Sequence, residues 1–240
     1  MKRKAKSVTR YILRFLAVIS TIIFLFVGFY AIKGYMMYKS AAAESPVSEI
    51  AYDLSRQENY TYYNELPRIY IDAVISVEDK HFEDHCGIDV LAIGRAMLTD
   101  IRTMSFKEGG STITQQIAKN QLFTQDKKIE RKFAEIFAAF ALEKEYSKEE
   151  LFEIYVNTIY FGEGYYGIYN AAQGYFGKTP SELTDYEAVM LAGLPNAPSD
   201  YSLSDNEEMA EKRMSVVLDA MVKCGKLTED RANEILNSED

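Results

Sequence analysis

The chain has 240 residues, 48% of them hydrophobic, and a formal net charge of −9. This length suits one domain of ordinary size with an appendage, and the apolar content is enough for a core. Of the 27 basic residues, eight lie in 1–39 with no acidic neighbour, so the remainder carries 19 basic against 36 acidic groups, a net of −17. Such an acidic domain is a poor candidate for general nucleic-acid binding, and no nucleic-acid partner is expected.

Residues 15–32 form an uncharged apolar run, FLAVISTIIFLFVGFYAI. As a helix it would be about 27 Å long, which nearly matches a bilayer core of about 30 Å. A signal peptide cleaved near 41–43 is the alternative, although its apolar region would usually be shorter. The basic residues cluster before the run. The positive-inside rule therefore predicts a cytoplasmic tail over 1–14, a transmembrane helix over 15–32 and an extracellular remainder in a single-pass membrane protein.

The rest of the chain divides into a polar segment, 33–65, interpreted as a juxtamembrane stalk, and a domain over 66–240. Apolar residues recur at helical spacing from Leu66 onward, and strand signals are few, so the fold class is predicted to be mainly α. Thr112 with Gln115, and Ser147 with Glu150, are predicted to cap helices. The expected helices cover 90–104, the stretch after Thr112, 129–146, 148–161, 187–194, 209–221 and 229–236.

The stretch ISVEDKHFEDHCGID, residues 75–89, contains both histidines of the chain. His81 and His85 are spaced i, i+4, but the zinc-protease pattern needs Glu directly after the first histidine, and Phe82 stands there. Structural hydrogen bonding is therefore favoured over a zinc site. Cys86 and Cys224 are expected to be free, with a disulfide as the alternative.

Two further stretches indicate anion binding. In EGGSTITQQIAKNQLF, residues 108–123, a glycine pair before a helix can present N–H groups to an anion, although no Walker-type lysine follows. In KKIERKFAE, residues 127–135, basic side chains lie opposite an apolar stripe, with simple pairing of Arg131 and Glu135 as the alternative. An enzyme that acts on a phosphate-activated sugar would need these groups. One carboxylate accepts a proton from the attacking hydroxyl, and cations stabilise the departing phosphate. Lysozyme-like hydrolysis needs two carboxylates but no cation cluster.

Five ordered stretches carry a specific family resemblance over about residues 66–235: EDKHFEDHCGID, GGSTITQQIAKN, RKFAE, LFEIYVNTIYFG and AAQGYFGKTPSELTDYEAVMLAGLPNAPSDY. The chain resembles the peptidoglycan glycosyltransferases, which occur as monofunctional transglycosylases and as domains of class A penicillin-binding proteins. The resemblance implies a lysozyme-like helical domain with a mobile, membrane-contacting jaw. It also implies polymerisation of lipid II into glycan strands, with inversion and release of undecaprenyl pyrophosphate.

The same resemblance implies roles for individual residues. Glu78 matches the general base, and Glu135 matches a second essential carboxylate on the donor side. Residues implied near the substrate are Asp79, Phe82, Arg95, Ser111, Gln115, Gln116, Lys119, Asn120, Lys127, Arg131 and Lys132, with Glu153 and Asn157 organising the cleft from behind. His81 departs from the pattern, because the family usually has a basic residue there, and Ala134 stands where some members have lysine.

The resemblance also bears on cofactors and partners. A divalent cation, Mg²⁺ or Mn²⁺, often assists such enzymes, but no ligand set can be read here, and no organic cofactor is expected. The expected partners are lipid II, the growing glycan strand, the membrane and other cell wall synthesis proteins. Neither Ser-x-x-Lys nor Lys-Thr-Gly occurs, so a monofunctional enzyme is expected rather than one with a transpeptidase. A module that only binds lipid II and a glycan hydrolase are the rival hypotheses.

Overall fold

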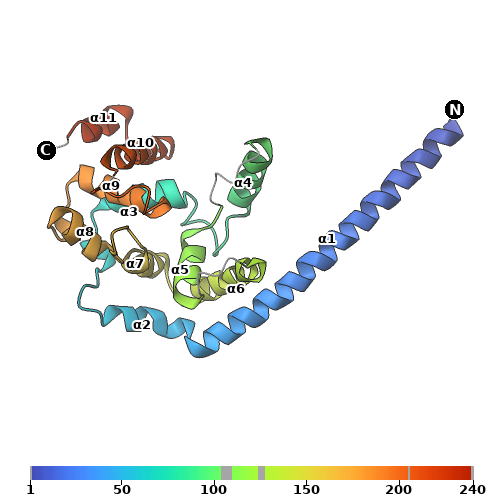
Figure 1. Cartoon of the computed structure of the whole chain (residues 1–240), viewed down its shortest axis with the longest axis horizontal. Coiled ribbons are helices and arrows are strands. Elements are labelled where there is room, and N and C mark those ends of the chain that lie inside the picture. The colour runs from blue at the N-terminus through green and yellow to red at the C-terminus, as the bar shows by residue number, and fades with distance from the viewer. Residues whose placement is uncertain (1, 104–109, 124–127, 205, 239–240) are drawn as a thin grey trace.

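The structure, a computed structural model, describes residues 2–103, 110–123, 128–204 and 206–238 (Figure 1). Its α-helices are α1 (Lys2–Glu44), α2 (Ile50–Ser55), α3 (Arg68–Glu78), α4 (Val90–Thr103), α5 (Ile113–Leu122), α6 (Ile129–Glu145), α7 (Lys148–Thr158), α8 (Ile168–Phe176), α9 (Asp185–Gly193), α10 (Glu207–Lys223) and α11 (Glu229–Leu236). Short 3₁₀ helices occupy Val47–Glu49, Tyr63–Glu65, Pro180–Glu182 and Leu194–Asn196. Within the described ranges no strand forms, and a single antiparallel bridge joins Tyr160 to Tyr166. The predicted mainly α class is confirmed.

The N-terminal helix α1 leaves the body of the molecule as a long rod (Figure 1). Its segment Tyr11–Glu44 is long and apolar enough to cross a membrane, and its most apolar window is not buried against the rest of the chain. An apolar surface of this kind needs lipid or another cover, because water would solvate it poorly. The prediction of an N-terminal apolar helix is therefore confirmed.

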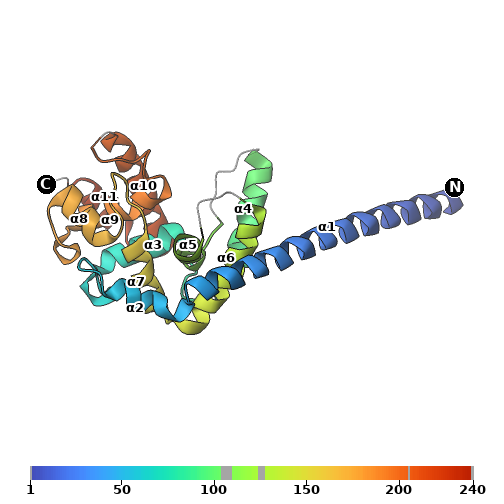
Figure 2. The same ribbon diagram turned by 60° about the horizontal axis from the view of Figure 1, so that its bottom comes forward.

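The segment after the apolar run differs from the predicted stalk. Residues 33–44 continue α1 without a break, and its last turns lie beside α6 in both views (Figure 2). Further on, Ile50 and Leu54 of α2 belong to the core. Tyr146, at the end of α6, accepts a hydrogen bond from Ala51 N and donates one to Val47 O. Because these partners lie some hundred residues further along the chain, the local polarity of 33–65 could not show that the segment is packed.

The core of the domain contains a cluster of tyrosine and phenylalanine rings, and the chain has no tryptophan. Phe152 of α7 lies at its centre and is fully buried. It contacts the rings of Tyr63, Tyr70, Phe82 and Tyr155, with centroids 5.8 to 6.5 Å apart. These distances are typical of edge-to-face and tilted aromatic pairs. Helices α3 and α7 and the loop that follows α3 are thereby held in one body.

The helix ends follow the predicted capping residues. The Thr112 side chain accepts a hydrogen bond from Gln115 N while the Gln115 side chain accepts one from Thr112 N, which starts α5. Ser147 and Glu150 form the same reciprocal pair at the start of α7. Both predicted capping boxes are confirmed. Helix α7 ends at Thr158, earlier than predicted, because the chain turns there and Gly167 N donates to Ile159 O.

Candidate active site

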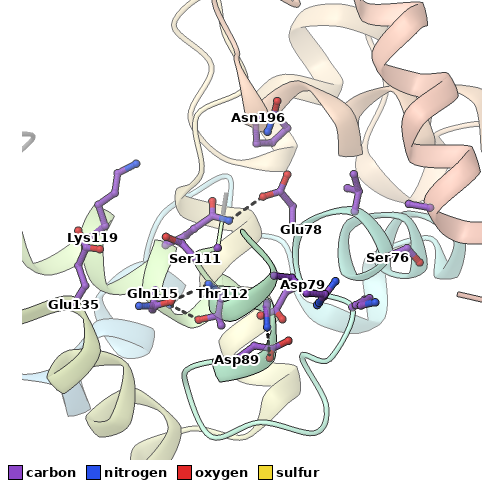
Figure 3. A pocket seen from close by; sticks show the side chains of 18 of the residues that line it. Ser76, Glu78, Asp79, Asp89, Ser111, Thr112, Gln115, Lys119, Glu135 and Asn196 are labelled. Carbon is purple, nitrogen blue, oxygen red and sulfur yellow. Dashed lines mark hydrogen bonds between the residues drawn. The ribbon is translucent and has the colours of Figure 1, made fainter. Parts of the chain in front are cut away.

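A pocket of about 600 Å³ opens between the end of α3, the start of α5, α6 and α10 (Figure 3). Sequence segments that lie far apart meet here. The predicted residues that line it are Glu78, Asp79, Arg95, Ser111, Gln115, Gln116, Lys119, Lys132 and Glu135. In the close-up, Glu78 lies on one side and Glu135 on the other, with Ser111 between them (Figure 3). The two carboxylates therefore line one pocket.

Glu78 ends α3, and its side chain is only 11% exposed. Its Oε2 accepts a hydrogen bond from Gln116 Nε2 at 2.9 Å, whereas its buried Oε1 has no hydrogen-bond partner among the described residues. The closest cation is Arg213 of α10, whose Nη2 lies 3.5 Å from Oε1. Burial raises the pKa of Glu78, and the Gln116 bond and the Arg213 charge oppose that rise. The result is a carboxylate with a free lone pair and a raised affinity for a proton.

Asp79 joins two walls of the pocket. Its Oδ2 accepts a hydrogen bond from Ile113 N, the first residue of α5, at 2.9 Å, and the carboxylate also bonds His85 Nε2 at 2.9 Å. His85 Nδ1 accepts from Gly87 N at 3.1 Å, so the proton of a neutral ring must sit on Nε2, where it is donated to Asp79. This carboxylate fixes the end of α3 to the start of α5.

The other histidine is also part of a structural hydrogen-bond network. His81 Nδ1 lies 2.6 Å from Asp89 Oδ2, and Asp89 Oδ1 accepts from Ala92 N in the first turn of α4. Burial raises the pKa of Asp89, but the His81 and Ala92 bonds outweigh it and lower that pKa. In the part of the chain that the structure describes, no group of three or more His, Cys, Asp or Glu side chains could hold a metal ion. Cys86 and Cys224 are both free.

Glu135 lies on α6 and is fully buried. Its Oε2 is 2.7 Å from Lys132 Nζ, and its Oε1 is 3.2 Å from Arg131 Nε. Both oxygens are thus engaged by cations one turn earlier on the same helix. The pairing of Arg131 with Glu135, left open from the sequence, occurs together with the basic patch. Lys132 faces the pocket and also approaches Ser111 Oγ at 3.4 Å.

Lys119 of α5 projects on the same side as Glu135 (Figure 3). Burial lowers its pKa, the charge of Lys132 lowers it further, and the Glu135 charge opposes both. It makes no ion pair with any residue in the described ranges, so its charge is not neutralised there. An ammonium group that is partly desolvated, beside a second cation, gains most from an incoming anion.

Five of the predicted residues lie outside the pocket lining. Phe82 is 1% exposed and belongs to the aromatic core, where Lys148 Nζ lies 4.6 Å from its ring centre. Arg131 is buried behind Glu135, and Asn120 is outside the pocket lining. Lys127 lies outside the described residues. The remaining two residues, Glu153 and Asn157, lie behind the pocket on α7.

Glu153 and Asn157 hold the segment that leads into α3. Glu153 accepts hydrogen bonds from Tyr60 Oη at 2.6 Å and from Tyr63 N at 2.7 Å. Asn157 pairs with both backbone groups of Thr61 at 2.8 Å. This backbone has no other regular structure to satisfy its polar groups, so the two side chains take that role. They fix the start of the element that ends at Glu78.

The pocket residues that the sequence reasoning missed include Asn196 and Arg213. Arg213 donates from Nε to Gly193 O at 3.3 Å and turns its other end toward Glu78. Helical spacing could have pointed to Arg213, because it lies on the same face of α10 as the buried residues Ala210, Met214 and Val217. A basic residue on an apolar helix face requires a partner. Asn196 gave no signal of that kind.

A buried carboxylate with a raised pKa thus lies opposite a wall that carries lysine side chains, in a mainly α domain. A family model described as transglycosylase matches residues 44–222. The chain belongs to the transglycosylase family, which confirms the resemblance to the peptidoglycan glycosyltransferases.

Known relatives agree with that assignment. Penicillin-binding protein 1A of Neisseria flavescens is 41% identical over 77% of this chain and 23% of its own length. Penicillin-binding protein 1F of Bacillus subtilis is 40% identical over 86% of this chain and 29% of its own. The chain thus spans about a quarter of these relatives. A crystal structure of penicillin-binding protein 1A from Haemophilus influenzae aligns with 53% of this chain and 16% of its own at 26% identity, with a TM-score of 0.36, too loosely to add to the assignment.

Proposed function

We propose that this chain is a membrane-anchored peptidoglycan glycosyltransferase that polymerises lipid II into glycan strands. The observation that carries the proposal is the contrast within one pocket. Glu78 offers a buried oxygen with no hydrogen-bond partner in the described part of the chain, and the opposite wall offers Lys119 and Lys132. A sugar activated by a diphosphate needs a base at one end of the reacting bond and cations at the other.

In this reaction, Glu78 accepts the proton of the acceptor sugar 4-hydroxyl as its oxygen attacks the anomeric carbon of the donor. The bond between that carbon and the diphosphate oxygen breaks, and the diphosphate leaves with the electron pair. Attack opposite the leaving group inverts the anomeric carbon. The raised pKa of Glu78 suits a base that works near neutral pH better than an ordinary carboxylate would.

The cationic wall would receive the leaving diphosphate. Lys119 and Lys132 supply charge at the pocket surface, and Arg95 of α4 supplies more at the rim. Glu135 holds Lys132 and Arg131 in place through its two oxygens. Cations fixed before the reaction stabilise the developing charge without a further reorganisation cost. The product diphosphate is undecaprenyl pyrophosphate in this proposal.

The position of α1 supports a lipid-linked substrate. Lys33 is the first charged residue after the apolar run 15–32, and its Nζ bonds Glu130 Oε1 at 2.8 Å. Glu130 starts the turn of α6 that carries Arg131 and Lys132. If the run spans the bilayer, these cations lie at the depth of the lipid phosphates. We propose a cytoplasmic N-terminus and an extracellular domain.

The donor set of the pocket does not form a metal cage. Asp79, Asp89 and Glu135 already bond histidine, backbone or cationic groups, and Glu78 bonds Gln116 and lies 3.5 Å from Arg213. Mg²⁺ commonly binds through substrate phosphates with one or two carboxylates. We propose that any Mg²⁺ or Mn²⁺ enters with the diphosphate. Other cell wall synthesis proteins remain proposed partners.

The test uses the full chain in detergent micelles with labelled lipid II. The expected result is polymer from the wild type and its loss in Glu78→Gln. Glu83→Gln is the matched control, because Glu83 lies on the exposed loop five residues further on. Intact lipid II that is only bound would favour a binding module. Shortened glycan would favour a hydrolase, and polymer at wild-type rate from Glu78→Gln would contradict the role of that carboxylate.

A further inference from the structure

Gly34 of α1 packs against α6 with no room for a side chain. Gly34 is buried, although the neighbouring residues Lys33 and Tyr35 are exposed. A Cβ atom placed on Gly34 would lie 2.4 Å from Phe133 Cβ and 2.8 Å from Ala134 N of α6. The second contact is to backbone, which a side-chain rotation cannot relieve. Any larger residue at position 34 must therefore push the two helices apart.

Contacts on either side of Gly34 fix how the two helices meet. Lys33 Nζ bonds Glu130 Oε1, and the Tyr35 ring meets the Phe137 ring edge-on with centroids 5.3 Å apart. Small residues at helix crossings allow such close packing, and the flanking contacts set the register. At the far end of α6, Tyr146 bonds Val47 and Ala51, which follow α1 directly. The N-terminal segment therefore holds α6 at both ends.

The same stretch of α6 carries the cationic wall. Phe133 and Ala134, which touch Gly34, lie between Lys132 and Glu135 in the sequence. Their side of the helix meets the anchor, while Lys132 and Glu135 reach the pocket. A rigid helix transmits a displacement from one face to the other. We infer that α1 is a positioning element of the active site and that Gly34 is the positioning residue that sets the distance of Lys132 and Glu135 from Lys119 and Glu78.

This inference rests on the proposed function, so its test has one readout that needs no activity. The variants are Gly34→Leu and its control Gly28→Leu, in the full chain. Gly28 lies on the same helix, with nothing within 4 Å of a Cβ placed on it. Leucine is an apolar helix former, so both variants keep the anchor apolar and helical. They differ in whether the new side chain meets α6.

The first readout is crosslinking of Tyr35→Cys to Phe137→Cys by a short bis-maleimide, with Cys86 and Cys224 replaced by serine. We expect Gly34→Leu to reduce the crosslink yield several-fold and Gly28→Leu to leave it unchanged. An unchanged yield in Gly34→Leu would mean that the helices need not pack closely there, and the inference would be wrong.

The second readout is the Michaelis constant for lipid II against kcat in micelles. A variant that merely unfolds in part loses kcat at constant KM, because KM does not depend on the fraction of active molecules. A displaced cationic wall should raise KM as well, with kcat/KM lower by on the order of 10²-fold, the effect of a misplacement of about 1 Å. We expect this in Gly34→Leu and a change below about twofold in Gly28→Leu, as for surface changes that touch nothing.

The outcomes separate the two proposals. Reduced crosslinking with raised KM supports the positioning role. Reduced crosslinking with unchanged kinetics, or with a loss of kcat alone, would overturn it. If neither the wild type nor any variant forms polymer, the proposed function fails. The crosslink yields alone then decide whether Gly34 sets the packing of α1 on α6.

Discussion

The two glutamates of the pocket are placed in opposite ways. Glu78 lies beside an amide, a carboxylate neighbour and one arginine at 3.5 Å, and its Oε1 makes no hydrogen bond to any described residue. Glu135 is more deeply buried, and both of its oxygens lie within 3.2 Å of cations on its own helix. The burial of Glu78 favours uptake of a proton, whereas Glu135 holds two positive groups beside the pocket.

The difference shows how one residue type can serve two purposes in one cavity. Burial pushes Glu78 toward the neutral form, and the Gln116 hydrogen bond and the Arg213 charge oppose that tendency only in part. Glu135 instead contacts two cations of its own helix, Arg131 and Lys132. The environment of each glutamate, rather than its presence in a motif, therefore assigns its role. Four substitutions test this contrast.

Glu78→Gln should separate activity from stability. We expect turnover to fall by about 10³-fold, within the range for loss of a general base. A carboxyl group with a raised folded-state pKa loses stability as pH rises through that pKa, so the neutral amide should leave the melting temperature at pH 7 unchanged or higher. Lipid II turnover and calorimetry on the same preparation would measure both. A large drop in melting temperature would instead mark Glu78 as structural.

Glu135→Gln should lower both activity and stability. The amide leaves Arg131 buried beside a neutral group, and breaking a buried ion pair costs about 3 kcal/mol. Denaturant unfolding monitored by circular dichroism would show this loss. Glu145→Gln, at the exposed end of the same helix, should leave the unfolding curve unchanged. A Glu135→Gln protein as stable as wild type would remove the distinction between the two carboxylates.

Lys119→Ala should affect substrate binding rather than folding. We expect KM for lipid II to rise about tenfold, equivalent to about 1.4 kcal/mol. The lysine is partly buried beside Lys132, so its loss should not lower the melting temperature. Lys144→Ala, an exposed lysine of α6, is the matched control. Unchanged affinity with a lowered melting temperature would contradict this role.

Arg213→Met should change the pH profile with a smaller effect on the maximal rate. Loss of the charge near Glu78 raises the pKa of that carboxyl further, so a higher pH is needed to ionise the base. We expect the acidic limb of kcat/KM to move upward by about one pH unit, or about 1.4 kcal/mol. Arg213→Lys keeps the charge and should move it less. An unmoved limb would show that Arg213 does not act on Glu78.

Much of the fold could be predicted from the sequence because its signals are local. The apolar stripe of α6 and the capping boxes at Thr112 and Ser147 depend on residues a few positions apart. The packing of α1 on α6 depends on Gly34 meeting Phe133, a contact that no local pattern reports. For this reason the sequence analysis treated residues 33–65 as a stalk outside the domain, although they pack against it.

The candidate site divides in the same way. The family resemblance pointed to Glu78, Lys119 and Glu135, because each lies in one of the short stretches that carry that resemblance. Phe82 lies in the same motif as Glu78 but belongs to the core, because the loop after α3 turns that ring inward against Phe152. Arg213 reaches the pocket from α10, whose place beside α3 is decided by tertiary packing. Spacing indicates which residues share a helix, and it does not indicate which helices meet.

The Asp79 carboxylate has a mechanical consequence. One side chain bonds the first amide of α5 and a histidine of its own loop while standing next to Glu78. Asp79 thus links the end of α3, where Glu78 lies, to the start of α5, which Ser111 and Thr112 precede. This link fixes the distance between Glu78 and these two residues.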